Sequence, residues 1–250
     1  MKPIFRHLFV RMSRIFYIVY LRENCGNRAK SLKILEATRT IRGAFADYFG
    51  KFRSRKQQEI SDSQALGTFL ETRASHVAQT ALYGYIRTRA GSRFPELFEN
   101  DEFVTAINIA KWQLWVSCLS DLTVYAGGLL SRQDDQEIDA STTATIISEI
   151  AQNILDRTQT PEDAGEEFSK SCAAYISRLD TIQWDKVGDN EAAFTESPDA
   201  LVYWAPIVDD LKALDSEIVR NSVRFRWQEV RRDLRGILDA RAVFEARPSR

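Results

Sequence analysis

The chain has 250 residues, of which 44% are hydrophobic and 28% charged, with only 11 glycines and 6 prolines. This composition is typical of a globular protein with a real core, and the scarcity of Gly and Pro favours long helices over a turn-rich β fold. The 2 histidines are too few for a di-iron carboxylate bundle, and the widely spaced Cys25, Cys118 and Cys172 predict reduced thiols and argue against a zinc site.

Charge is distributed unevenly along the chain. Residues 1–58 carry 14 Lys or Arg against 3 acidic residues, residues 59–217 carry 11 against 28, and residues 218–250 carry 9 against 4. The net charges are therefore +11, −17 and +5, which sum to the −1 of the whole chain. The basic ends either bind an external anionic partner or pack against the acidic middle, and the sequence leaves both interpretations open.

The first predicted helix runs from about Ile4 to Arg22 and is apolar, aromatic and basic. Its uninterrupted apolar run, from Ile15 to Leu21, has 7 residues and is followed by Arg-Glu-Asn-Cys, not by small residues suited to cleavage, which makes it a weak secretory signal. The segment is too short and too charged for a membrane span. We expect an amphipathic helix on an anionic membrane surface or a partner protein, against the alternative of a core helix with a positive rim. The residues expected to bind are Phe5, Arg6, Leu8, Phe9, Arg11, Met12, Arg14, Phe16, Val19 and Arg22.

A second helix is predicted over residues 29–57, where apolar side chains recur at helical spacing. Together with the first helix it forms a basic N-terminal helical extension, residues 1–58. Residues 59–250 are expected to form an α-helical domain.

Within that domain, Asp62 or Ser63 looks like the N-cap of a helix that ends near Gly91. The most apolar element covers residues 101–130, and its only charge from residue 112 onwards is Asp121. Its apolar length is compatible with a membrane span, but the acidic residue at its centre and the polar residues nearby favour a central helix surrounded by other helices.

Ser141 precedes a short helix with an apolar face of isoleucines. Thr160 and Pro161 match an N-cap followed by proline at the first helical position, so the next helix is predicted from there to about Leu179.

Residues 181–205 break the helical period and are interpreted as a long packed connection, with Trp184 and Trp204 as its anchors. Pro206 is expected to begin the last helix, which runs past Leu238. The predicted fold class is therefore all-α: a bundle of about seven helices with a long C-terminal helix and a basic amphipathic N-terminal helix.

Motifs for catalysis or phosphate binding are absent from the sequence: it has no GxSxG, no SxxK, no HxxxD, no GxGxxG and no GxxxxGK[ST]. One polar cluster is a candidate site, formed by His76 on the helix after Asp62 and by Ser120 and Asp121 on the apolar helix. If these helices pack antiparallel, a Ser–His–Asp grouping is geometrically feasible. The structural alternative is a buried His–Asp hydrogen bond, which the lack of a nucleophile elbow favours.

Arginine and aromatic residues alternate in residues 223–227 (VRFRW) and in residues 49–56. Nucleic-acid-binding surfaces combine positive charge with stacking rings in this way. The near-neutral net charge and the position of Trp227 on an apolar stripe favour arginine rims over buried rings instead.

Two stretches carry a resemblance to a known family: TALYGYIRTRAGSRFPELFENDEFVTAINIAK...CLSDLTVYA in residues 80–126, and SPDALVYWAPIVDDLKALDSEIVRNSVRFRWQEVRRDLR in residues 197–235. Together they resemble a poorly characterised bacterial family of helical proteins sometimes labelled "esterase", over about residues 60–245. The resemblance implies ester hydrolysis, and it carries no functional residue over to this chain.

The sequence thus favours a non-enzymatic helical scaffold or adaptor that docks on a partner protein or an anionic membrane surface through its basic N-terminal segment. An ester hydrolase is the alternative function, and a nucleic-acid-binding protein is the third. We expect no cofactor and no metal, and self-association stays open. The expected location is the cytoplasm, including a peripheral position on the cytoplasmic face of the inner membrane.

Overall fold

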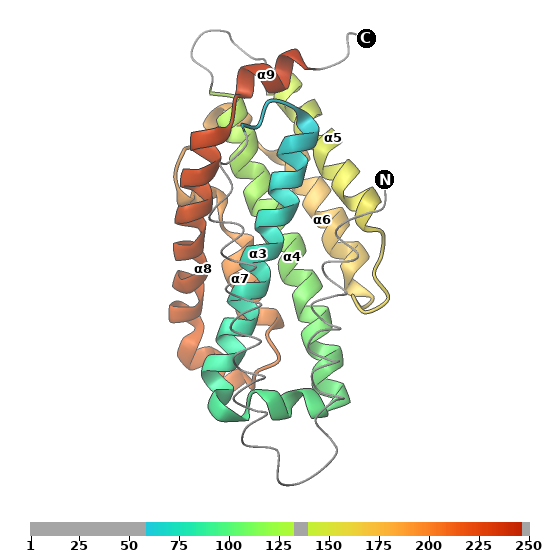
Figure 1. Ribbon diagram of the computed structural model, residues 1–250, viewed down its shortest axis with the longest axis vertical. Helices are drawn as coiled ribbons and strands as arrows, with labels where there is room; N and C mark the ends of the chain where they lie inside the picture. The colour runs from blue at the N-terminus through green and yellow to red at the C-terminus, as the bar shows by residue number, and fades with distance from the viewer. Residues whose placement is uncertain (1–58, 133–139, 247–250) are drawn as a thin grey trace. The chain divides into compact units, whose positions relative to one another are not determined.

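The computed structural model describes residues 59–132 and 140–246 (Figure 1). The chain divides into two units, Met1–Gln58 and Glu59–Arg250, and all described residues belong to the second. These described residues form a bundle of seven α-helices with short 3-10 helices between them, which confirms the predicted all-α fold class. The helices expected in residues 1–58 lie outside the described part of the chain.

The apolar helix α4 (Asp101–Leu130) is the centre of the bundle. It runs antiparallel to α3 (Ser63–Ala90), and the two are joined by the 3-10 helices η1 (Gly91–Arg93) and η2 (Pro95–Glu99) (Figure 1). Helices α3, α5, α6 and α7 pack against α4 and bury most of its residues, including Asp121. The interpretation of α4 as a central helix is therefore confirmed. Within the described residues, no helix has the length and apolar character needed to cross a membrane.

The caps at these helix starts follow from the sequence. Asp62 accepts a hydrogen bond from the backbone N–H of Ala65 at 2.7 Å. Of the two residues predicted as the N-cap of α3, Asp62 is therefore confirmed. Asn100 accepts from the N–H of Phe103 at 2.9 Å and caps α4 in the same way. Each cap satisfies one of the N–H groups that the first turn of a helix leaves without a partner.

Helices α5 (Ala140–Thr158) and α6 (Glu167–Thr181) follow, and the predicted start of α6 at Thr160–Pro161 is wrong. The residues before Glu167 form a turn pinned to α4. The Asp163 carboxylate accepts hydrogen bonds from Lys111 Nζ at 3.1 Å and Trp112 Nε1 at 2.7 Å. These contacts to α4 hold the segment before Glu167 in a non-helical conformation. Helix α6 therefore begins about two helical turns later in the sequence than predicted.

The predicted connection over residues 181–205 contains three helical elements that the sequence analysis missed: η3 (Trp184–Lys186), η4 (Glu191–Ala193) and α7 (Glu196–Trp204). Trp184 is buried as expected of an anchor, whereas Trp204 is half-buried. The connection is therefore packed, as predicted, but more than half of it is helical.

The long helix α8 (Asp209–Ile237) begins three residues after Pro206 and is followed by the short α9 (Ala240–Glu245). Its buried stripe consists of Val219, Val223, Trp227, Val230 and Leu234. The helix ends at Ile237, so the prediction that it runs past Leu238 is wrong. At its end, the N–H of Ile60 donates to the carbonyl of Ile237 at 2.7 Å, and the N–H of Asp239 donates to the carbonyl of Ile60 at 2.9 Å. The first and last described segments are thus paired at one end of the bundle.

Candidate functional site

The carboxylate of Asp121 lies fully buried in the middle of α4 and accepts five hydrogen bonds. Its Oδ1 accepts from Arg178 Nη1 at 2.8 Å and from the backbone N–H groups of Thr195 at 3.3 Å and Glu196 at 3.1 Å. Its Oδ2 accepts from the N–H of Ser197 at 2.8 Å and from the Ser197 hydroxyl at 2.6 Å. The backbone donors are the N-cap residue Thr195 and the first two residues of α7, so Asp121 caps that helix from outside it.

Two further helices join this arrangement. Arg178 of α6 donates through Nη1 to the Ser120 hydroxyl at 2.8 Å, and through Nη2 to the Ala193 carbonyl at 3.0 Å. Trp227 of α8 donates through Nε1 to the Ser197 hydroxyl at 3.0 Å. We call the group of Ser120, Asp121, Arg178, Ser197 and Trp227 the Asp121 network. It links α4, α6, α7 and α8 through groups that burial would otherwise leave unsatisfied.

The electrostatics of Asp121 reflect this setting. The pKa of Asp121 is raised, because the effect of burial outweighs the charge of Arg178 and the hydrogen bonds of Ser197, which lower it. A carboxylate offers about four lone-pair directions, and the five donors take them all. Asp121 is therefore occupied as an acceptor and presents no open oxygen to a substrate.

His76, the other member of the predicted cluster, is half-buried on α3 in different surroundings. Burial lowers the pKa of His76, and the charges of Arg73 and Arg226 lower it further, against the opposing effect of Glu229. None of the five hydrogen bonds of Asp121 comes from His76. The structure thus brings Ser120 and Asp121 together at Arg178, and it assembles this group without the histidine.

The candidate membrane- or partner-binding residues of the N-terminal segment, from Phe5 to Arg22, lie outside the described residues. They remain predictions from the sequence.

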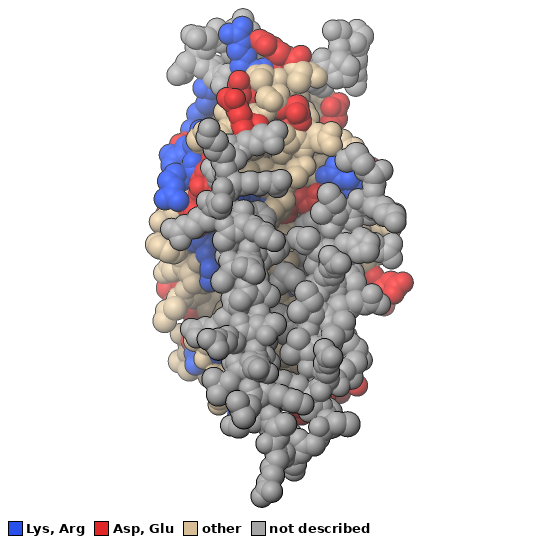
Figure 2. All heavy atoms as spheres, viewed as in Figure 1, with Lys and Arg blue, Asp and Glu red and all other residues tan. Residues whose placement is uncertain are grey.

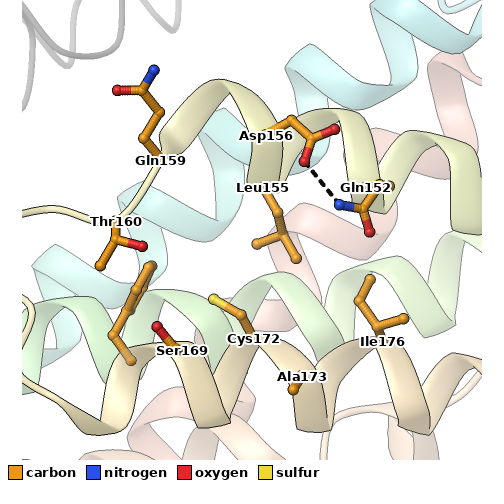
Figure 3. Close-up of a pocket in the computed structure, with 10 residues that line it drawn as sticks. Gln152, Leu155, Asp156, Gln159, Thr160, Ser169, Cys172, Ala173 and Ile176 are labelled. Atoms are coloured by element: carbon orange, nitrogen blue, oxygen red, sulfur yellow. Dashed lines mark hydrogen bonds between the residues drawn. The ribbon is translucent and has the colours of Figure 1, made fainter.

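A pocket of about 460 Å³ lies between α5 and α6 (Figure 3). Asp156 and Gln152 line its α5 side, where Gln152 Nε2 donates to the Asp156 carboxylate at 2.8 Å. Cys172 lines the α6 side, and burial raises the pKa of its thiol to about 11. A thiol that stays protonated at neutral pH is a poor nucleophile.

The surface of α8 carries exposed apolar side chains opposite its buried stripe. Leu214, Ile218 and Phe225 are 76%, 73% and 71% exposed. Tyr203 at the end of α7 and Val208 just before α8 are also exposed. Large apolar side chains gathered on one face of a surface helix are typical of an interaction site. We call Leu214, Ile218 and Phe225 the outer stripe of α8.

Several arginines of α8 pair with acidic residues of the middle of the chain. Arg220 Nε donates to Asp199 at 2.5 Å, and Arg235 Nη1 donates to Asp189 at 3.0 Å. Arg231 also lies 3.6 Å from the Asp189 carboxylate. Figure 2 shows basic side chains at the left edge of the view, over the upper part of α8. Three arginines of the C-terminal basic segment are therefore paired with acidic residues of the middle of the chain.

Among the described residues, no group of three or more His, Cys, Asp or Glu side chains is arranged to hold a metal ion. Comparison of the chain with known protein families, with characterised proteins and with solved structures finds no match in any of the three. The resemblance to helical proteins labelled as esterases therefore stays an expectation from the sequence.

The sequence analysis missed the outer stripe of α8. Its signal was present in the sequence, because the spacing of Leu214, Ile218 and Phe225 places all three on the same face of a helix.

Proposed function

We propose that this protein is a non-enzymatic helical adaptor that docks on an anionic membrane surface through its basic N-terminal segment, residues 1–58. The observation that carries the proposal is the net charge of +11 in residues 1–58, beside −12 in residues 59–250. Each Lys or Arg near an anionic bilayer contributes about 1 kcal/mol of attraction. The acidic domain is repelled by the same surface, so the attraction has to come from the N-terminal segment.

The apolar residues of the same segment support insertion at the membrane interface. In the helix predicted over residues 4–22, Phe5, Phe9 and Phe16 accompany the arginines. A basic amphipathic helix gains both from burying such rings at the headgroup boundary and from attraction to anionic lipid. An interfacial helix is therefore the favoured interpretation of this part of the sequence.

The described domain supports an adaptor in a second way. Its buried polar groups, above all the Asp121 network, connect four helices to one another. Such a network rigidifies a bundle, and a rigid body with an exposed apolar surface is suited to presenting a binding face.

Co-sedimentation of the full chain with lipid vesicles tests the proposal. The protein should pellet with vesicles that contain phosphatidylglycerol and stay in the supernatant with pure phosphatidylcholine. Binding should weaken as salt is added, because screening shortens the range of the attraction. The double variant Arg11→Glu/Arg14→Glu should bind at least about tenfold more weakly, since it removes and reverses two of the attracting charges.

The matched control is Arg93→Glu/Arg241→Glu, which makes the same change in net charge at exposed positions of the domain. It should bind nearly as well as the wild type. If the wild type stays in the supernatant with anionic vesicles, membrane docking is wrong and a partner protein becomes the better proposal. If both double variants lose binding equally, the attraction is not specific to the N-terminal segment.

A further inference from the structure

The outer stripe of α8 continues into a heptad pattern. Leu214, Ile218, Asn221 and Phe225 follow one another at steps of four, three and four residues, and Leu211 precedes them by three. This is the a/d spacing of a coiled-coil seam, and it lies on the face of α8 that points away from Val219, Val223 and the rest of the buried stripe. The helix therefore has one apolar face for its own bundle and a second one for another helix.

Charged side chains border the seam along one edge. Glu217 accepts a hydrogen bond from Asn221 Nδ2 at 3.4 Å, and Arg224 Nη1 donates to Asn221 Oδ1 at 3.0 Å. Glu217 and Arg224 themselves approach to 4.0 Å. These side chains lie at the g positions of the heptads, and the side chain of Glu217 is 74% exposed. One edge thus carries an acidic and a basic residue seven positions apart.

We propose that the outer stripe of α8 binds α8 of a second copy of this chain, with the two helices antiparallel. The proposal goes beyond the membrane docking proposed above and depends on different residues. A two-fold axis near residue 220 places Leu214 against Phe225 of the second copy and Ile218 against Asn221 of the second copy. The same axis places Glu217 beside Arg224 of the second copy, and each such contact occurs twice.

The charges are therefore complementary to the same surface in another copy. Paired g positions of antiparallel helices meet across the seam, so two attractive Glu217–Arg224 pairs form between the copies. In a parallel pairing, Glu217 would face the uncharged Ser222, and Arg232 would meet Arg232 of the second copy at the seam. The charge pattern favours a second copy as the occupant, and it selects the antiparallel orientation.

Sedimentation equilibrium of the full chain in buffer without lipid tests this proposal. The 28.6 kDa chain should sediment at twice its monomer mass at micromolar concentration. Glu217→Arg alone and Arg224→Glu alone should each weaken dimerisation by about tenfold, because each turns two attractive contacts into repulsive ones. The double variant Glu217→Arg/Arg224→Glu should restore the dimer, because it exchanges the two charges and keeps every pair attractive.

Matched controls are Glu162→Arg, in the exposed turn before α6, and Arg93→Glu, in η1; both should dimerise as the wild type does. Ile218→Asp should give a monomer with unchanged far-UV circular dichroism, because the side chain is exposed in the bundle. A wild type that stays monomeric overturns the proposal. The proposal is also overturned if the wild type forms a dimer that none of the α8 variants weakens. It is overturned as well if the double variant dimerises as weakly as the single variants do. Because lipid is absent, none of these outcomes depends on membrane docking.

Discussion

A single carboxylate, Asp121, holds the start of a helix that is distant from it in the sequence. Helix α7 has nine residues, too few to be stable in isolation, and its first-turn N–H groups find their acceptor on α4. The same carboxylate neutralises Arg178, whose side chain is only 16% exposed. Asp121 therefore contributes to stability through two roles, as a helix cap and as a counter-ion.

We predict that Asp121→Asn lowers the free energy of unfolding by about 3 kcal/mol. The amide leaves the guanidinium of Arg178 with only the partly exposed Glu196 as its counter-ion, and its NH₂ group meets a donor where an oxygen accepted before. Urea unfolding followed by circular dichroism measures the change. Asp180→Asn, at an exposed position of α6, is the control and should stay within about 0.5 kcal/mol of the wild type. Equal stability of both variants would show that the five hydrogen bonds contribute nothing measurable.

Asp189 gives the domain a defined response to acid. Burial alone would raise the pKa of Asp189, but the hydrogen bonds from Tyr125 and Arg235 and the charges of Arg235 and Arg231 outweigh it and lower the pKa. A carboxyl whose pKa is lower in the folded state stabilises the fold above its unfolded pKa of about 4. That stabilisation is lost as pH falls through the folded pKa.

We therefore predict that Asp189→Asn is less stable than the wild type at pH 7, and that the difference shrinks as the pH falls below about 4. Urea midpoints measured at a series of pH values from neutral to strongly acidic test this. A difference that stays constant over the whole series would contradict a lowered pKa at Asp189.

At the scale of elements, the close approach of η3 to the last turn of α4 depends on two glycines. A Cβ atom at Gly127 would lie 2.2 Å from the ring of Trp184, and one at Gly128 would lie 2.4 Å from the side chain of Val187. The Ser131 hydroxyl also donates to the Trp184 carbonyl at 2.7 Å. The glycine pair thus lets the segment after α6 pack directly on the backbone of α4.

We predict that Gly127→Ala lowers the free energy of unfolding by about 2 kcal/mol, because the buried indole of Trp184 has to move to admit the methyl group. Gly236→Ala is the matched control, since nothing lies within 4 Å of a Cβ at that position of α8. It should raise stability by up to about 1 kcal/mol, because alanine favours a helix more than glycine does. Thermal denaturation of the three proteins compares them, and a Gly127→Ala variant at least as stable as the wild type would refute the close packing.

The long elements were predictable because their signals are local. The cap at Asp62, the apolar run of α4 and the buried stripe of α8 each follow from residues within one or two helical turns. The buried face of α3 is less evident from its sequence: Ala65 and Phe69 are half-buried, while Leu66, Leu70 and Ala74 next to them are buried. Faces one residue apart differ by 100° on a helix, so a sequence with several apolar residues leaves the choice open.

The missed features depend on contacts between distant residues. Helix α7 starts where Asp121 can cap it, and α6 starts late because Asp163 is bound by Lys111 and Trp112. In the candidate site, the sequence analysis chose Asp121 correctly as a buried polar residue but paired it with His76. Its actual partner, Arg178, lies 57 positions away, and nothing in its neighbourhood in the sequence marks it.

At the scale of the whole molecule, the pairing of Ile60 with the end of α8 determines where the chain enters the described domain. In the proposed dimer, a two-fold axis near residue 220 puts the end of α8 about 25 Å from the axis along the helix. The two copies point in opposite directions, so the two entry points are separated by about 50 Å. The proposed dimer therefore carries two membrane-binding N-terminal segments, which join it at widely separated points. It would contact the membrane at two places that are many lipid headgroups apart.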